Sequence, residues 1–282
     1  MQDSLQTIID QQHDSWNRFA AGWKKWDSVN MQFLQPIGEE IISRLDIGPD
    51  NLVLDIASGT GEPGLSIAAK LTSGRVIALD LSENMLAIAS QHAADRKISN
   101  FETRAGDIST LPFPDSTVDA ICCRMGFMFF PDIPQALAEM HRVLKPGGRL
   151  AASVWDSPQK NFWVTVTMGT IAEVLQLQPP PPDAPGMFRC ARPGFMQDQF
   201  QSAGFSEVLT TEVATSLNQA PEKYWEMITE VGAPIVAALK EADADTREHI
   251  RKRVFEKIHQ AFPQGDFRLQ ANALVLSGTA LK

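Results

Sequence analysis

The stretch VLDIASGTGEPGLSIAA, residues 53–69, is the feature that most limits what this chain can fold into. Its apolar start predicts a buried strand over residues 51–57, and the glycines that follow predict a tight loop leading into a helix over residues 62–70. These glycines have the spacing G-x-G-x-x-G, at Gly59, Gly61 and Gly64. Because the amides at the start of such a helix attract polar ligands, the segment indicates a β-α unit with a ligand site at the end of its strand.

The same alternation of strand and helix continues along the chain. A helix is expected after Ser82, a good N-cap, and another over residues 133–145, ended by Pro146 and Gly147. Further strands are expected at residues 75–82, 100–107, 118–125, 149–155, 206–216 and 267–278. Repeated β-α units predict an α/β fold: a doubly wound, mostly parallel, seven-stranded Rossmann-like sheet with helices on both faces.

The composition of the chain limits the kinds of molecule that it is expected to bind. The net charge of −9 at pH 7 argues against a nucleic-acid partner, which would need clustered Lys and Arg. No apolar run is long enough to span a membrane, and no N-terminal segment resembles a signal peptide. Cys122 and Cys123 suit buried strand positions better than metal ligation, so we expect no metal site and a cytoplasmic location.

Asp55 distinguishes between two ligand classes for the glycine loop. In a dinucleotide-binding fold the residue four places before the first glycine is usually apolar, because it still lies inside the strand. A carboxylate there would repel a pyrophosphate, whereas it would favour an α-ammonium group. Tyr224, the only tyrosine, lies in a late helix, and no hydride-transfer Tyr or His is recognisable. An NAD(P)-dependent oxidoreductase therefore remains only an alternative.

The pattern D-x-A-x-G-x-G, residues 55–61, resembles the nucleotide-binding loop of the class I S-adenosylmethionine-dependent methyltransferases. ALDLSENML resembles that family's second strand, AGDISTLPFPDSTVDAI its third-to-fourth strand segment, and EMHRVLKPGGRL the helix and turn before its fifth strand. The sequences of these motifs most resemble those of the ubiquinone/menaquinone-biosynthesis C-methyltransferase-like group. Four ordered motifs in one register are far more specific than the glycine spacing alone.

The resemblance implies S-adenosylmethionine as cofactor. It assigns Asp80 to the ribose hydroxyls and places Asp107 near the adenine amino group. The expected cofactor-binding residues are Asp55, Ala57, Ser58, Gly59, Gly61, Asp80, Leu81, Met85, Asp107, Ile108, Arg124 and Met125.

The chain is expected to divide into segments around this core. Residues 1–45 form an N-terminal helical lid, 46–156 the S-adenosylmethionine-binding core, 157–204 a cap insertion, and 205–282 the C-terminal completion of the sheet with inserted helices. The cap contains QPPPPDAPGMF, residues 178–188, which predicts a stiff extended loop.

The lid and cap indicate a small apolar or aromatic acceptor, methylated at oxygen, carbon or nitrogen. The expected substrate-binding residues are Trp23, Trp26, Phe127, Phe129, Trp155 and Phe188. No base is convincing, and His13 and Asp156 are the weak candidates for a catalytic role. A non-catalytic module that binds the methyl donor and regulates a partner therefore stays open. The oligomeric state is also open, with a homodimer among the options.

Overall fold

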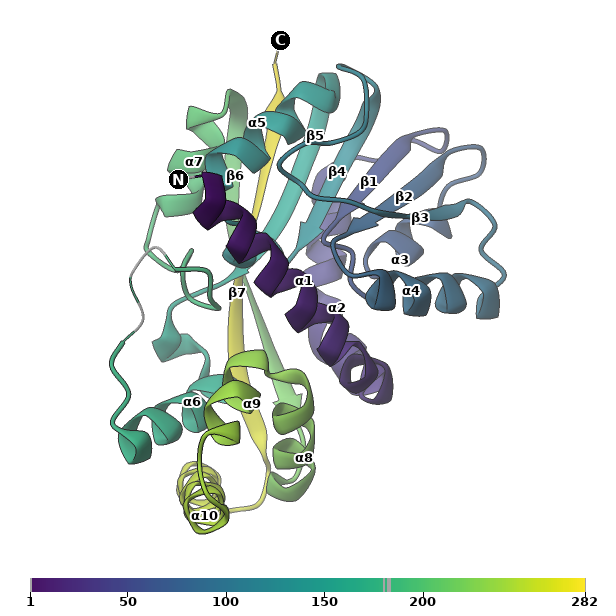
Figure 1. Cartoon of the computed structure of the whole chain (residues 1–282). Coiled ribbons are helices and arrows are strands. Elements are labelled where there is room, and N and C mark those ends of the chain that lie inside the picture. The colour runs from purple at the N-terminus through teal and green to yellow at the C-terminus, as the bar shows by residue number, and fades with distance from the viewer. Residues whose placement is uncertain (1, 180, 182–183, 282) are drawn as a thin grey trace.

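A seven-stranded sheet organises the molecule (Figure 1). The computed structural model describes residues 2–179, 181 and 184–281, so Pro180, Pro182 and Asp183 of the expected stiff loop lie outside the described residues. In sequence order the strands are β1 (Leu52–Ile56), β2 (Arg75–Asp80), β3 (Phe101–Ala105), β4 (Val118–Arg124), β5 (Leu144–Trp155), β6 (Phe205–Asn218) and β7 (Arg268–Ala280). Their order across the sheet is β3-β2-β1-β4-β5-β7-β6.

Strands β1 to β5 pair in parallel, whereas β7 is antiparallel to both β5 and β6. The prediction of a seven-stranded, mostly parallel α/β sheet is confirmed. The sequence did not indicate that the last strand would insert between β5 and β6. This insertion depends on pairing between segments far apart in the chain, such as Trp155 with Ala273.

The helices expected after the glycine loop and before β5 are both present, but their first or last residues differ from those expected. The helix predicted over residues 62–70 is α3 (Gly64–Ala68). The helix predicted over residues 133–145 is α5 (Ile133–Val143), which ends before Pro146 because Leu144 is already extended and begins β5. The others are α1 (Gln2–Lys25), α2 (Asp27–Leu45), α4 (Glu83–Asp95), α6 (Phe162–Leu175), α7 (Phe195–Ser202), α8 (Pro221–Val231), α9 (Ala233–Lys240), α10 (Ala244–Ala261), and the 3-10 turns η1 (Phe127–Phe129) and η2 (Pro158–Lys160).

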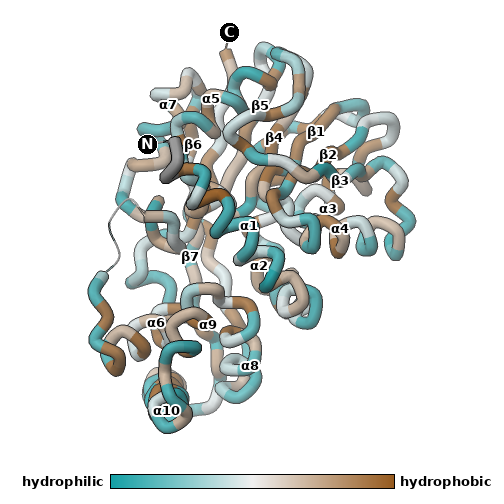
Figure 2. The backbone as a smooth tube through the Cα atoms, viewed as in Figure 1, coloured by the Kyte–Doolittle hydropathy of each residue, from teal (hydrophilic) through white to brown (hydrophobic). Residues whose placement is uncertain are grey.

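Helices cover both faces of the sheet. Helix α2 packs on β4, β5, β6 and β7, while α5 packs on the other face of β5 and α7 beside it on β6 and β7. Brown apolar strands fill the centre of the tube view, and the outer helices carry the teal polar residues (Figure 2). Cys122 and Cys123 are fully buried free thiols on β4, as predicted. Among the described residues, no helix is long and apolar enough to cross a membrane.

A group of helices and the single helix α1 lie beside the carboxyl ends of the strands. Helices α6, α8, α9 and α10 contact one another and form the lower group in Figure 1. Helix α1 runs diagonally across the front of the molecule and contacts both α4 and α8. This group and α1 together enclose the space beyond the strand ends, which is where open α/β sheets bind ligands.

Candidate functional site

A cavity of about 430 Å³ lies at the carboxyl ends of β1 to β5. Helices α1 and α2 supply one wall, and α6 with the α8–α9 turn supplies another. The floor is made by the glycine loop and by the residues that follow the strands. The location is that of a ligand site in an open α/β sheet.

The glycines of the loop have different physical roles. Gly59 has a φ of +54°, and no atom lies within 4 Å of the place where its Cβ would be, so its bare backbone borders the cavity. A Cβ on Gly61 would lie 2.7 Å from the side chain of Leu65, and one on Gly64 would lie 2.5 Å from Asp55 Oδ2. Gly61 does not line the cavity, contrary to the expected ligand contact. The two later glycines are needed for packing.

Asp55 lies beneath the loop and not in the cavity. Its Oδ2 accepts a hydrogen bond of 2.9 Å from the amide of Gly64 at the start of α3. Complete burial raises the pKa of its carboxyl group to about 7. The side chain therefore supports the loop from below, and the expectation that it would face an ammonium group directly is not met, since Asp55 is not a lining residue.

Asp80 ends β2 and faces the cavity. Its Oδ2 accepts from the amide of Gly59 at 2.8 Å, and its Oδ1 accepts from the amide of Ser82 at 2.9 Å. Burial raises the pKa of the carboxyl group, while these amide bonds stabilise its charged form. Ser82 is the N-cap of α4 as predicted, and its hydroxyl accepts from the amide of Met85. A carboxylate has about four acceptor positions, so Asp80 can still accept from a hydroxyl of a ligand.

The other predicted cofactor residues mostly border the same cavity. Asp107 is held in place by the amide of Ser109 at 3.0 Å. Arg124 ends β4, and burial lowers its pKa while Glu62 and Asp55 favour its charged form. The predicted residues that line the cavity are Ala57, Ser58, Gly59, Asp80, Leu81, Met85, Asp107, Ile108, Arg124 and Met125.

An aromatic wall closes the cavity at the end of β5. It consists of Phe33 from α2, Trp155 from β5 and Trp163 from α6, whose ring centroids are 5.0 to 5.8 Å apart. Only Trp155 was predicted. Phe33 was missed because it lies in an ordinary amphipathic helix, and Trp163 because its apolar segment NFWVTV follows β5 without a recognisable motif.

Helix α1 adds a second aromatic group. Trp16 packs edge-on against Phe129 at 5.2 Å and against Trp23 at 6.4 Å, and all three residues line the cavity. Trp26 does not, because its indole donates to Glu230 in α8.

Two predicted substrate residues also lie outside the cavity. Phe127 is fully buried against Phe130 and Phe200, and Phe188 packs on the main apolar core. Instead, a wall that the sequence did not indicate comes from Ile228, Val231 and residues 232–235, at the α8–α9 turn. Their only local signal was the apolar run GAPIVA, far from every motif.

Neither candidate base reaches the cavity. His13 Nε2 lies 2.9 Å from Glu83 Oε2, and Asp156 accepts from Asn272 at 2.7 Å and pairs with Lys160 at 2.8 Å. Both side chains are engaged in contacts between structural elements and are not lining residues. Within the described part of the chain, the ionisable lining residues are Glu62, Asp80, Asp107 and Arg124.

The sheet order argues against a dinucleotide-binding fold. Such folds have a mostly parallel sheet in the order 3-2-1-4-5-6, in which the fifth and sixth strands are neighbours. Here the antiparallel β7 stands between β5 and β6. This protein therefore shares the glycine spacing of the dinucleotide-binding folds, but its strand order differs from theirs.

Comparison with known proteins agrees with this geometry. A family model described as "Methyltransferase domain" matches residues 53–148. The chain is 34% identical to the demethylmenaquinone methyltransferase of Listeria monocytogenes serotype 4a (strain HCC23) over 172 residues, which cover 55% of this chain and 70% of the relative.

Solved structures share the fold. A chain of the complex between the Haloferax volcanii Trm112 methyltransferase activator and a methyltransferase has a TM-score of 0.59 and 18% identity, with 96% of this chain and 97% of that chain covered. The YcgJ protein of Bacillus subtilis has a TM-score of 0.56 and 19% identity, with 88% and 99% covered.

Proposed function

Because this chain belongs to the class I S-adenosylmethionine-dependent methyltransferases, in the group related to the menaquinone and ubiquinone methyltransferases, we propose that its cavity binds donor and acceptor at opposite ends. The donor is S-adenosylmethionine, which supplies a methyl group already activated on a sulfonium. The acceptor is a small apolar molecule with an aromatic ring. The alternatives of an NAD(P)-dependent oxidoreductase and of a non-catalytic regulatory module gain no support from the family match.

The observation that carries this proposal is that the ionisable lining residues and the aromatic wall of Phe33, Trp155 and Trp163 stand at the ends of different strands. The ionisable lining residues follow β1, β2, β3 and β4, whereas the aromatic wall stands at the end of β5. In the sheet, β5 is the neighbour of β4 on the side away from β1. The aromatic wall therefore lies next to the strand ends that carry the ionisable residues.

The residues at the charged end fit the donor. Gly59 leaves the space that a side chain would fill, and the Asp80 carboxylate, held by the amides of Gly59 and Ser82, is placed to accept from a ribose hydroxyl. The buried hydroxyl of Ser58 has no hydrogen-bond partner among the residues that the structure describes, so it is available to a ligand. Three carboxylates against one guanidinium make this end favourable for a cation. Asp55 and Gly61 act from beneath, by holding the loop in shape.

The residues at the aromatic end fit an apolar ring. Phe33, Trp155 and Trp163 pack on one another, with their ring centroids 5.0 to 5.8 Å apart. They present an apolar surface, joined by Ile228 and Val231 from α8. The relatives are named for a demethylmenaquinone acceptor, which makes that compound the first acceptor to test.

The chain's contribution to the reaction is alignment and exclusion of water. The described lining residues include no His, Cys, Lys or Tyr, and the carboxylates lie at the donor end. The acceptor therefore brings a nucleophile that needs no base from the protein: a neutral amine, an electron-rich ring carbon or an oxygen that is already ionised. Holding that atom behind the methyl group in a closed cavity supplies the rate enhancement.

The segments expected from the sequence acquire functions in this proposal. Residues 46–156 bind the donor, residues 1–45 act as a lid, residues 157–204 form a cap beside the acceptor, and residues 205–282 complete the sheet and add the α8–α9 wall.

The test combines binding with turnover. Calorimetry should show S-adenosylhomocysteine binding and no NADH binding, and S-adenosylhomocysteine should form from S-adenosylmethionine with ring-bearing apolar acceptors, including demethylmenaquinone analogues. NADH binding alone would restore the oxidoreductase. Binding without turnover on any acceptor, including lipid extracts, would favour the regulatory module.

A further inference from the structure

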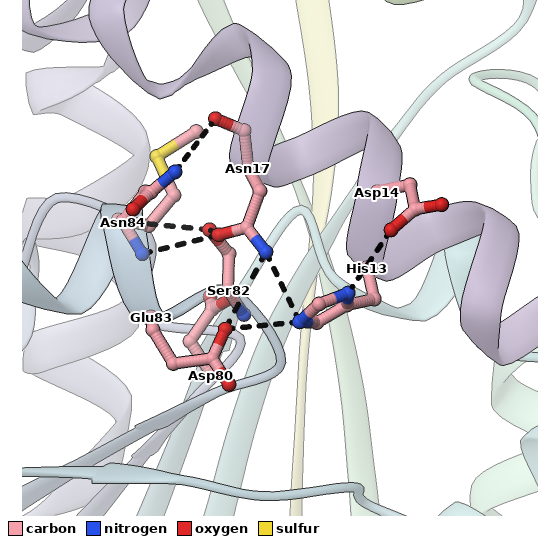
Figure 3. A network of polar contacts seen from close by, with 8 residues as sticks. His13, Asp14, Asn17, Asp80, Ser82, Glu83 and Asn84 are labelled. Carbon is pink, nitrogen blue, oxygen red and sulfur yellow. Dashed lines mark hydrogen bonds and ion pairs between the residues drawn. The ribbon is translucent and has the colours of Figure 1, made fainter.

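We propose that Asn17 is a positioning residue that couples closure of helix α1 to occupation of the donor site. The inference rests on the proposed function, since it takes the floor beneath α1 to be the donor site. It begins from a network of polar contacts between α1 and the first turn of α4, which Figure 3 shows from close by.

Asn17 makes several bonds to the start of α4 at once. Its Oδ1 accepts from the hydroxyl of Ser82 at 2.7 Å and from the amide of Asn84 at 3.1 Å. Its backbone oxygen accepts from the Asn84 side chain at 3.2 Å, and its Nδ2 donates to Glu83 Oε2 at 3.4 Å. A single side chain thus joins the lid to three consecutive residues.

The contacts continue without a break into the donor site. Ser82 donates its only hydroxyl proton to Asn17, while the same oxygen caps α4 by accepting from Met85. The amide of Ser82 donates to Asp80 Oδ1, and Asp80 Oδ2 accepts from the amide of Gly59. Asn17 is therefore two residues removed from the loop that holds the donor.

An apolar contact between α1 and α4, called the seam below, lies beside this network. Trp16 and Trp23 of α1 pack on a small cluster formed by Ala20, Met85 and Ile88, which is separate from the main core. Most of the stability of a helix in a protein comes from packing of its apolar face on such a surface. Because Met85 also lines the cavity, the seam and the donor site share a wall.

The consequence is reciprocal coupling. A donor bound to Asp80 fixes the β2–α4 turn in the conformation that Asn17 requires, and a docked α1 fixes the same turn in the conformation that the donor requires. Linkage then makes donor binding and lid docking favour each other equally. Asn17 touches neither substrate in this scheme and acts through the first turn of α4, where Ser82 is its link to Asp80.

The experiment compares Asn17→Ala with wild type and with Gln11→Ala, an exposed amide on the same helix that contributes nothing to the network. Calorimetry would measure S-adenosylhomocysteine affinity, and hydrogen exchange would measure protection of the α1 amides with and without that ligand. We expect Asn17→Ala to bind about five- to tenfold more weakly, at the low end of typical coupling between two sites, because its side-chain bonds to Ser82, Glu83 and Asn84 are lost. The ligand should slow α1 exchange in wild type and in Gln11→Ala, and no longer in Asn17→Ala.

Two further measurements keep the inference falsifiable. Ser82→Ala removes the hydroxyl that donates to Asn17, so the double variant Asn17→Ala/Ser82→Ala should bind S-adenosylhomocysteine no more weakly than Ser82→Ala alone, and losses that simply add would overturn the coupling. A lower melting temperature for Asn17→Ala, with α1 still protected by the ligand, would show a merely structural contact and overturn the coupling. Failure of the wild type to bind S-adenosylhomocysteine would instead overturn the proposed function, which makes the two failures distinguishable.

Discussion

Gly22 of α1 packs directly on the backbone of Glu230 in α8, where a Cβ on Gly22 would lie only 2.5 Å from the Glu230 carbonyl oxygen. Lys25 and Trp26 hold the side chain of the same glutamate, at 2.6 and 2.7 Å. Helix α1 is therefore fastened at its C-terminal end to the acceptor side of the cavity, while Asn17 fastens it to the donor side. The lid bridges the two halves of the site.

Replacing Gly22 by valine should loosen this bridge. The added side chain cannot be accommodated by rotation, because it meets backbone, so α1 must move away from α8. We expect a melting temperature lower by several degrees, corresponding to about 1–3 kcal/mol, and reduced turnover. Gly169→Ala in α6 is the control, since a Cβ there meets nothing within 4 Å and alanine favours a helix. Equal stability of the two variants would contradict the close contact.

Replacing Asp80 by asparagine should weaken donor binding without unfolding the chain. The amide keeps the size of the side chain but loses a charged acceptor, so S-adenosylhomocysteine affinity should fall by roughly 1.5–3 kcal/mol. Calorimetry measures this loss, with the exposed Asp95→Asn on α4 as control. Unchanged affinity in a folded Asp80→Asn variant would remove Asp80 from the donor site.

Replacing Phe33 by leucine should weaken acceptor binding without changing donor binding. The change removes a ring from the aromatic wall but leaves the charged end intact. We expect the acceptor KM to rise about tenfold, the effect of losing roughly 1–1.5 kcal/mol of aromatic contact, with the affinity for S-adenosylhomocysteine unchanged. A loss of donor affinity of the same size would place Phe33 at the wrong end of the cavity.

The lid contact between His13 and Glu83 should depend on pH. The hydrogen bond to Glu83 raises the pKa of His13, so its contribution is complete below pH 6.5 and is lost as the pH rises through the raised value. Bonds from its own amide and then from His13 lower the pKa of Glu83, so its contribution is complete above pH 4.5 and is lost as the pH falls through the lowered value.

The window of strongest contact therefore lies between pH 4.5 and 6.5. The difference in melting temperature between wild type and Glu83→Gln should be largest there and should shrink toward pH 9. Asp14, which lies 3.3 Å from the same imidazole, supplies the control variant Asp14→Asn, with a smaller effect in the same direction. A difference that is constant from pH 5 to pH 9 would exclude titration of His13 as its cause.

The local features of the fold could be predicted because their signals lie within a few residues of one another. Alternating apolar segments indicated the strands, and Ser82 marked the start of α4 by capping an amide three residues later. Asp80 could be placed beside the glycine loop because the carboxyl ends of adjacent parallel strands meet at one edge of a sheet. The family resemblance added which ligand these residues serve.

What the tertiary structure decided depends on contacts between residues far apart in the chain. Gly59 and Gly61 share a motif, yet of the two only Gly59 borders the cavity, whereas a Cβ on Gly61 would meet the side chain of Leu65. The aromatic wall joins Phe33 to Trp155 and Trp163, and Asn17 meets Ser82 across 65 residues of sequence. A one-dimensional pattern specifies which residues will be buried, but only the folded chain selects which buried side chains touch. That selection made the acceptor wall and the lid contact in this protein.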